Sequence, residues 1–183
     1  MDKITQQAGF HGAPVALVTM LEEQDRVIVD QVVLGDVPGH LIDGHPWSTT
    51  LVRRLEERIV VRDYLATFAA TEDSARRVLR VSLALARMVE RQGAAGASAL
   101  GVAAWCAMAL GRWELADALA IESEHAAPNG LAELIRKGIA GRWICEVLGV
   151  EKDYDVEDVR RCSARTLRLL TEPRACLKGR SDR

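Results

Sequence analysis

Residues 92–111 run for 20 residues without a single charged side chain. That length is enough to cross a bilayer. The stretch is built chiefly from alanine and glycine, however, with only two leucines, one valine and one methionine. Small residues gain little from lipid, whereas they let packed helices approach closely. We therefore predict a buried core helix here and no membrane span.

The composition fits helices packed around such a core. The chain has 183 residues, of which 49% are hydrophobic, an amount that can fill one core without disulfides or metals. Aromatic residues make up only 4%, which disfavours a large β-sandwich or barrel. We expect a mostly α, single-domain helical bundle of about seven or eight helices.

Helical spacing begins at Ser48 and continues almost to the end of the chain. Apolar residues recur there at steps of three and four. Glycine and proline mark the ends of the segments. The pattern predicts helices over residues 48–58, 61–69, 72–92, 97–110, 113–125, 131–139 and 156–170, with a short apolar segment at 143–148.

The N-terminal quarter is patterned differently. Apolar runs at residues 15–21 and 27–34, the second rich in valine, flank a charged segment at 22–25. We predict two short strands joined by a turn, and the alternative is a helix over 15–24. This gives three regions: an arm at 1–47 with a possible β-hairpin and a Gly/Pro loop, a bundle at 48–172, and a basic tail at 173–183.

Residues 48–142 resemble the C-terminal helical part of the actinobacterial domain-of-unknown-function 4192 family. The matching positions are Val61-Arg62-Asp63-Tyr64-Leu65, Ala103-Ala104-Trp105, Gly111, Leu115-Ala116, Ala118-Leu119, Pro128, Leu131-Ala132, Leu134-Ile135 and Gly138. The resemblance implies a helical fold but no chemistry. The use of 20 arginines against 4 lysines agrees with an actinobacterial or phage source.

One helical hairpin is similar to a tetratricopeptide repeat. Gly111, Ala116 and Pro128 stand at the offsets that such a repeat uses for its turn, its close-packed small residue and its terminal proline. No second copy follows at a period of 34 residues. The likeness therefore predicts a single hairpin of this style and no repeat array.

The sequence contains no recognisable catalytic or metal-binding motif. Cys106, Cys145, Cys162 and Cys176 lie far apart, so no pair has the spacing of a zinc or redox site. His40 and His45 share a Gly/Pro loop, where they are expected to be solvated. We predict no catalytic residue, no metal and no cofactor. Without a secretory leader, we expect a cytoplasmic protein with free thiols, Cys106 and Cys162 being buried.

Two other residue sets could bind something but have plainer interpretations. Arg62 and Asp63 lie in the best-matching run of the resemblance, and we interpret them as a structural salt bridge. The tryptophans Trp105, Trp113 and Trp143 could stack on a ligand, yet each has apolar neighbours at helical spacing. We predict that all three anchor the core.

Positive charge is concentrated at the C-terminal end. Residues 159–183 contain eight basic side chains and two acidic ones. On a helical wheel, Arg161, Arg165 and Arg168 lie opposite an apolar face, and Arg174 and Lys178 follow in the tail. These five residues are the candidate partner-binding set, for which the alternative is a merely solvated face.

These features favour a non-catalytic helical interaction module with an unidentified protein partner. The alternative is a nucleic-acid-associated accessory protein that uses the basic C-terminal helix. A third possibility is an enzyme whose site is assembled from distant residues. The sequence does not indicate an oligomeric state.

Overall fold

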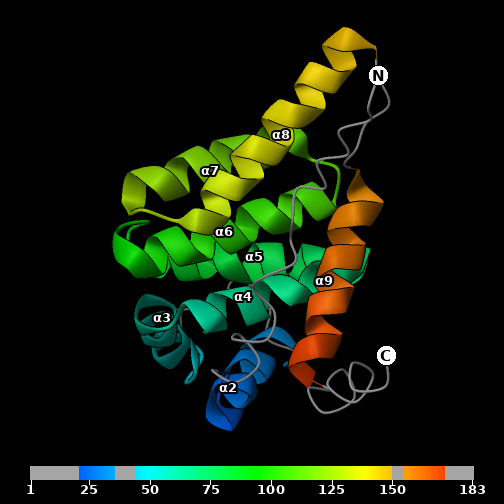
Figure 1. Ribbon diagram of the computed structural model, residues 1–183. Helices are drawn as coiled ribbons and strands as arrows, with labels where there is room; N and C mark the ends of the chain where they lie inside the picture. The colour runs from blue at the N-terminus through cyan, green and yellow to red at the C-terminus, as the bar shows by residue number, and fades with distance from the viewer. Residues whose placement is uncertain (1–20, 36–43, 150–154, 172–183) are drawn as a thin grey trace, which may run out of the picture.

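The computed structural model describes residues 21–35, 44–149 and 155–171, and within them the chain is an all-helical bundle with no strand. Eight α-helices and one short 3₁₀ segment, η2, follow one another (Figure 1). Their bounds are α2 Glu23–Val33, α3 Ser48–Glu57, α4 Ile59–Thr67, η2 Phe68–Ala70, α5 Glu72–Met88, α6 Gly93–Ala109, α7 Trp113–Ala126, α8 Gly130–Leu148 and α9 Val156–Thr171.

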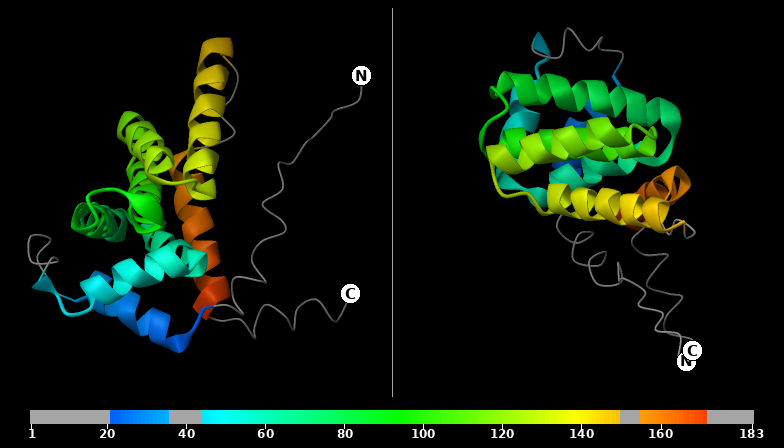
Figure 2. Two further views of the ribbon diagram at one scale, coloured as in Figure 1. Left: turned by 90° about the vertical axis from the view of Figure 1, so that its left-hand side faces the viewer. Right: turned by 90° about the horizontal axis from the view of Figure 1, so that it is seen from above.

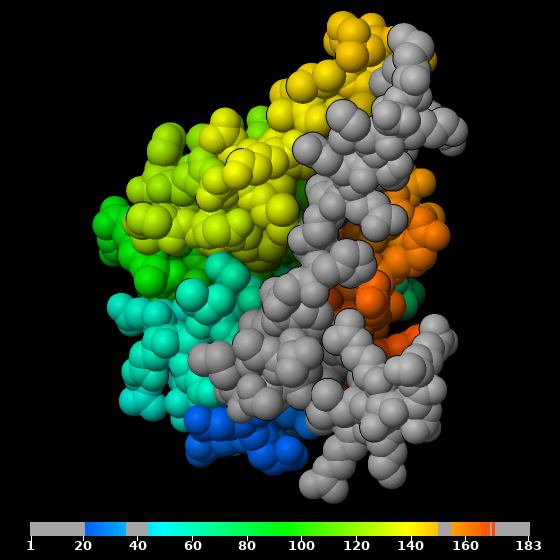
Figure 3. Space-filling model, in the orientation of Figure 1, coloured from blue at the N-terminus to red at the C-terminus, as the bar shows by residue number. Residues whose placement is uncertain are grey.

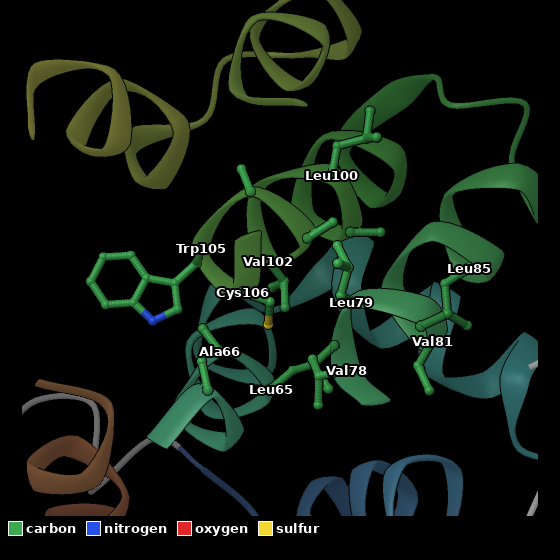
Figure 4. Packing of buried hydrophobic residues seen from close by; sticks show 14 of the residues in the cluster. Leu65, Ala66, Val78, Leu79, Val81, Leu85, Leu100, Val102, Trp105 and Cys106 are labelled. Carbon is green, nitrogen blue, oxygen red and sulfur yellow. The ribbon is translucent and has the colours of Figure 1, made fainter. Parts of the chain in front are cut away.

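Helix α6 lies at the centre of the bundle and packs against α3, α4, α5, α7, α8 and α9. Every residue from Ala95 to Ala109 is buried. A helix that is apolar on all sides must be enclosed on all sides, so the prediction of a buried core helix is confirmed. Figure 4 shows α6 side chains such as Leu100 and Cys106 meeting those of α4 and α5.

The prediction of strands is wrong where the structure describes the chain. Residues 27–33, expected in the second strand, belong to helix α2, and Leu34 follows as its C-cap. The buried residues of α2 include two pairs that are four residues apart, Ile28 with Val32 and Val29 with Val33. This spacing places all four on one face of a helix. Packing of that face overrides the preference of valine for strands. The first predicted strand, at 15–21, lies outside the described residues except for Leu21, which is not in a strand.

The charged segment expected to be a turn is the start of α2. Glu22 and Asp25 form a capping box. The Asp25 carboxylate is fully buried, 2.8 Å from Arg58 Nη1 and 3.5 Å from Arg54 Nε. A buried carboxylate needs such cationic partners. The pairing attaches the first turn of α2 to α3 and to the residue that follows it.

Most other helices begin and end near the predicted residues, but α8 does not end at 139. It continues to Leu148 and ends at Gly149, which adopts a positive φ of 63°. A glycine inside a helix weakens it by only about 1 kcal/mol, so Gly138 and Gly141 do not end it. The predicted helix at 131–139 and the apolar segment at 143–148 are therefore one element.

Helix α9 packs against α4, η2 and α6. Figure 1 shows it along one side of the bundle. The Trp105 Nε1 group of α6 donates to Ser163 Oγ at 2.9 Å. Arg160 Nε donates to the Ala109 carbonyl oxygen at 3.0 Å, at the end of α6. These two bonds fix α9 along the core helix. Among the described residues, no helix is long and apolar enough to cross a membrane.

Candidate interaction surface

Helix α8 starts inside the bundle and ends outside it. Its first ten residues bury Ala132, Ile135 and Ile139 against the neighbouring helices. Its last turns extend beyond the rest of the bundle, as Figure 1 and the left view of Figure 2 show. The large apolar side chains of these turns are exposed, in fractions of 47% for Trp143, 59% for Ile144, 85% for Val147 and 68% for Leu148.

The polarity of α8 inverts along its length. At 100° per residue, one side of the helix carries the buried residues and then turns charged, in the order Ala132, Ile135, Ile139, Arg142, Glu146. The opposite side begins charged and turns apolar, in the order Glu133, Lys137, Ala140, Ile144, Val147. A surface helix normally keeps its apolar stripe on the side of the core. The end of α8 does the reverse.

We call the exposed apolar and small residues on this opposite side of the helix end the outer face of α8; they are Ala140, Gly141, Ile144, Val147 and Leu148. In the space-filling view the end of α8 stands at the top of the molecule (Figure 3). Single exposed apolar residues are common on proteins, but a contiguous group of them is typical of a contact surface.

Charged side chains elsewhere on α8 are engaged within the molecule. Lys137 Nζ lies 2.6 Å from Glu133 Oε1, and this hydrogen bond lowers the pKa of the Glu133 carboxyl. Arg136 pairs with Glu124 of α7 at 2.7 Å. The Arg142 guanidinium lies over the Trp113 ring, 4.4 Å from its centroid. None of these groups lies on the outer face.

The tryptophans divide between core and surface. Trp105 is buried as predicted. Trp113 is half-buried and is covered by Arg142. The prediction that Trp143 anchors the core is wrong, because α8 continues past the bundle and carries Trp143 with it. Trp143 follows the buried Ile139 by four residues, but at this point of α8 the rest of the bundle no longer covers the helix.

The three described arginines of the predicted partner-binding set are exposed, and at least one of them forms an ion pair. Arg161, Arg165 and Arg168 lie on the solvent side of α9, opposite the buried Val159. Arg161 Nη2 pairs with Asp158 at 2.5 Å. The Asp155 backbone N–H and then Arg161 lower the pKa of the Asp158 carboxyl. Arg174 and Lys178, the other two residues of the predicted set, lie outside the described residues.

Arg62 and Asp63 form the predicted salt bridge, with Arg62 Nη2 2.6 Å from Asp63 Oδ1. Arg62 also belongs to a polar network that the sequence did not indicate. Its Nη1 group donates to Asn129 Oδ1 at 2.9 Å. Asn129 Nδ2 donates in turn to the Ala97 carbonyl oxygen at 2.6 Å and to Ser123 Oγ at 2.9 Å.

This network joins four helices at the start of α8. Asn129 caps α8 by accepting from the Leu131 N–H at 3.1 Å. A Cβ built on Gly101 would lie only 2.7 Å from Asn129 Nδ2, which is too close for a real contact. The glycine in α6 is thus required for the close approach. The network therefore holds the start of α8 against α4, α6 and α7.

Burial perturbs two of the described thiols and one tyrosine hydroxyl. Burial raises the pKa of the thiols of Cys106 and Cys162, the first fully buried as predicted and the second half-buried. Burial also raises the pKa of Tyr64 to about 12, beside Asp30, to which its hydroxyl donates at 3.1 Å. No three described His, Cys, Asp or Glu side chains gather in a group that could hold a metal ion.

Comparison of the chain with protein-family models, with curated proteins and with solved structures finds no match. The resemblances to the domain-of-unknown-function 4192 family and to a tetratricopeptide hairpin therefore stay predictions.

Proposed function

We propose that this chain is a cytoplasmic, non-catalytic helical interaction module that docks a protein partner on the outer face of α8. The observation that carries the proposal is the inverted polarity of that helix. Arg142 and Glu146 continue the stripe of the buried Ile135 and Ile139, while Ile144 and Val147 lie on the opposite side. A folded chain gains nothing from this arrangement unless another surface covers the apolar side.

The composition of the face supports a protein as the occupant. It combines three exposed aliphatic side chains with two small residues and has no charge, and the core of a protein interface is likewise depleted of charged residues. Nucleic acid, by contrast, would require basic side chains at the contact. The actinobacterial or phage origin suggested by composition and resemblance belongs to the same proposal.

The alternative, nucleic-acid binding through α9, has less support. Exposure of Arg161, Arg165 and Arg168 on one side of the helix favours it. However, Arg161 pairs with Asp158, and the neighbouring Arg160 pairs with Glu157 at 3.0 Å. Acids spaced along the same helix reduce the positive field that a phosphate backbone would meet. On the outer face of α8, by contrast, no neighbouring helix of the described chain covers the apolar side chains.

Site-specific photo-crosslinking in cells tests the proposal. A photoreactive amino acid at Val147, in the middle of the outer face, should give a crosslinked protein product identified by mass spectrometry. The same group at the exposed Arg80 of α5 is the matched control and should give none. If neither Val147 nor Ile144 yields a product above the control, the outer face of α8 is not a docking surface.

A further inference from the structure

We infer that the occupant of the outer face of α8 is the same face of a second copy of this chain, with the two helices antiparallel about a two-fold axis at Ile144. This inference rests on the proposed function, since it names the partner of that surface. A two-fold interface brings one patch against itself, so the patch must be complementary to its own rotated image. Three properties of the outer face meet that requirement.

The first property is the order of side-chain sizes. Small residues, Ala140 and Gly141, precede Ile144, and large residues, Val147 and Leu148, follow it. Rotation about Ile144 places Ala140 opposite Leu148 and Gly141 opposite Val147. Each large side chain then faces a small one, and both helices can pack closely. A parallel pair would instead set large against large.

The second property is the open space around Gly141. A Cβ built on this residue would meet nothing within 4 Å, so no contact inside the chain requires glycine there. Glycine inside a helix costs stability relative to alanine. A second backbone approaching this side of the helix gives the missing reason, just as the Asn129 amide does for Gly101 of α6.

The third property is the absence of charge at the contact. A two-fold axis brings the same set of residues from both copies into one contact, so any net charge on the face would be doubled there, whereas apolar residues carry no such cost. Arg142 lies away from the outer face, over the Trp113 ring. Glu133 and Lys137, at the edge of the face, neutralise each other within the helix.

The size of the face sets the expected affinity. Nine residues of one helix from each copy bury less than the roughly 1,600 Å² of a standard stable interface. The dimer should therefore be weak, with a Kd on the order of 10–100 μM. Sedimentation equilibrium of the full chain, from below to well above that range, should show monomer converting to dimer and no larger species.

Two substitutions at exposed positions test the contact without disturbing the bundle. Gly141→Leu fills the space needed by the opposite Val147, and Val147→Lys places two like charges at the contact. Each should raise the Kd at least about tenfold. Arg80→Leu, which adds an exposed apolar side chain on α5, is the control and should leave the Kd unchanged. Circular dichroism checks that all three variants are folded.

Disulfide trapping tests the antiparallel arrangement. In a chain whose Cys145 and Cys176 are replaced by serine, one preparation carries Ala140→Cys and another Leu148→Cys. Oxidation of the mixture should give crosslinked pairs of unlike chains, whereas each preparation alone should crosslink far less. Pairs of like chains in each separate preparation would overturn the antiparallel arrangement.

The outcomes separate this inference from the proposed function. A wild-type chain that stays monomeric at all concentrations, while Val147 still crosslinks a different protein in cells, overturns self-association and leaves the docking surface in place. A dimer whose Kd changes with neither Gly141→Leu nor Val147→Lys overturns the inference as well. No self-association together with no crosslink removes both.

Discussion

Helix α6 and the last turns of α8 are built from similar residues and have opposite surroundings. The buried surface of α6 and the outer face of α8 both lack charge, and both combine small with aliphatic side chains. In α6 every side is apolar, and neighbouring helices cover every side. In α8 the apolar side points away from the bundle while Arg142 and Glu146 continue the bundle side. The direction of an apolar stripe relative to the core therefore distinguishes an interior from a contact surface.

Glycine has a different role in each helix. Gly101 of α6 leaves room for the Asn129 amide, which holds the Ala97 carbonyl oxygen and Ser123. Gly141 of α8 has nothing near its Cβ position. One glycine is explained by the fold of a single chain, whereas the other is explained only by something outside it.

Thiol labelling should show the largest difference between the two helices. In single-cysteine variants, Cys106 of α6 should react with a thiol reagent at least about a thousandfold more slowly than Cys145 of α8, because it becomes accessible only through extensive unfolding. Burial also raises the pKa of the Cys106 thiol, so less thiolate is present to react. Labelling in denaturant, where the two rates should converge, is the control. Comparable native rates would mean that α6 is not enclosed.

Truncating one large side chain in each helix should separate them next. Leu100→Ala in α6 should lower the free energy of unfolding by about 2–5 kcal/mol, since the residue is fully buried. Ile144→Ala in α8 should lower it by less than about 1 kcal/mol in dilute protein. Urea denaturation measures both. Similar losses would indicate that the end of α8 packs on its own chain.

Adding one methyl group at each glycine should give the smallest effects, with opposite signs. Gly101→Ala should lower the free energy of unfolding by about 1–3 kcal/mol, because the new methyl group displaces the Asn129 amide. Gly141→Ala should raise it by about 0.5–1 kcal/mol through helix propensity alone. Thermal denaturation of dilute protein gives both signs. A loss at Gly141 would reveal a close contact within the chain.

The fold could be predicted from the sequence where one local pattern decides the structure. The uncharged run at 92–111 had to be enclosed, and spacing placed α3, α7 and α9 within a residue or two. Helix α2 was missed because its valines favour strands by local propensity, whereas packing against the other helices, which the sequence does not display, favours a helix. Asp25, in the first turn of α2, pairs with Arg58, which follows α3. No local sequence pattern contains that pairing, because the two residues are far apart in the chain.

The candidate site was found only in part. The exposed arginines of α9 follow from a single amphipathic helix, which the sequence displays directly. The outer face of α8 was missed because Gly138 and Gly141 suggested a helix end, and this separated Ile139 from Ile144. The signal was present nonetheless: Arg142 and Glu146 continue the three- and four-residue steps of the buried isoleucines. That reversal can be read once the segment is taken as one helix.

The Asn129 network gives α8 the mechanics of a beam clamped at one end. The helix is 19 residues long, about 28 Å at 1.5 Å per residue. Its first ten residues are held by the network and by Ala132, Ile135 and Ile139, and the remaining nine overhang by about 13 Å. Because of this overhang, a tilt of about 5° at the end of the clamped part moves the tip by roughly 1 Å. A force on Leu148 is therefore resisted at the start of α8, where the Asn129 side chain bonds to groups of α4, α6, α7 and α8.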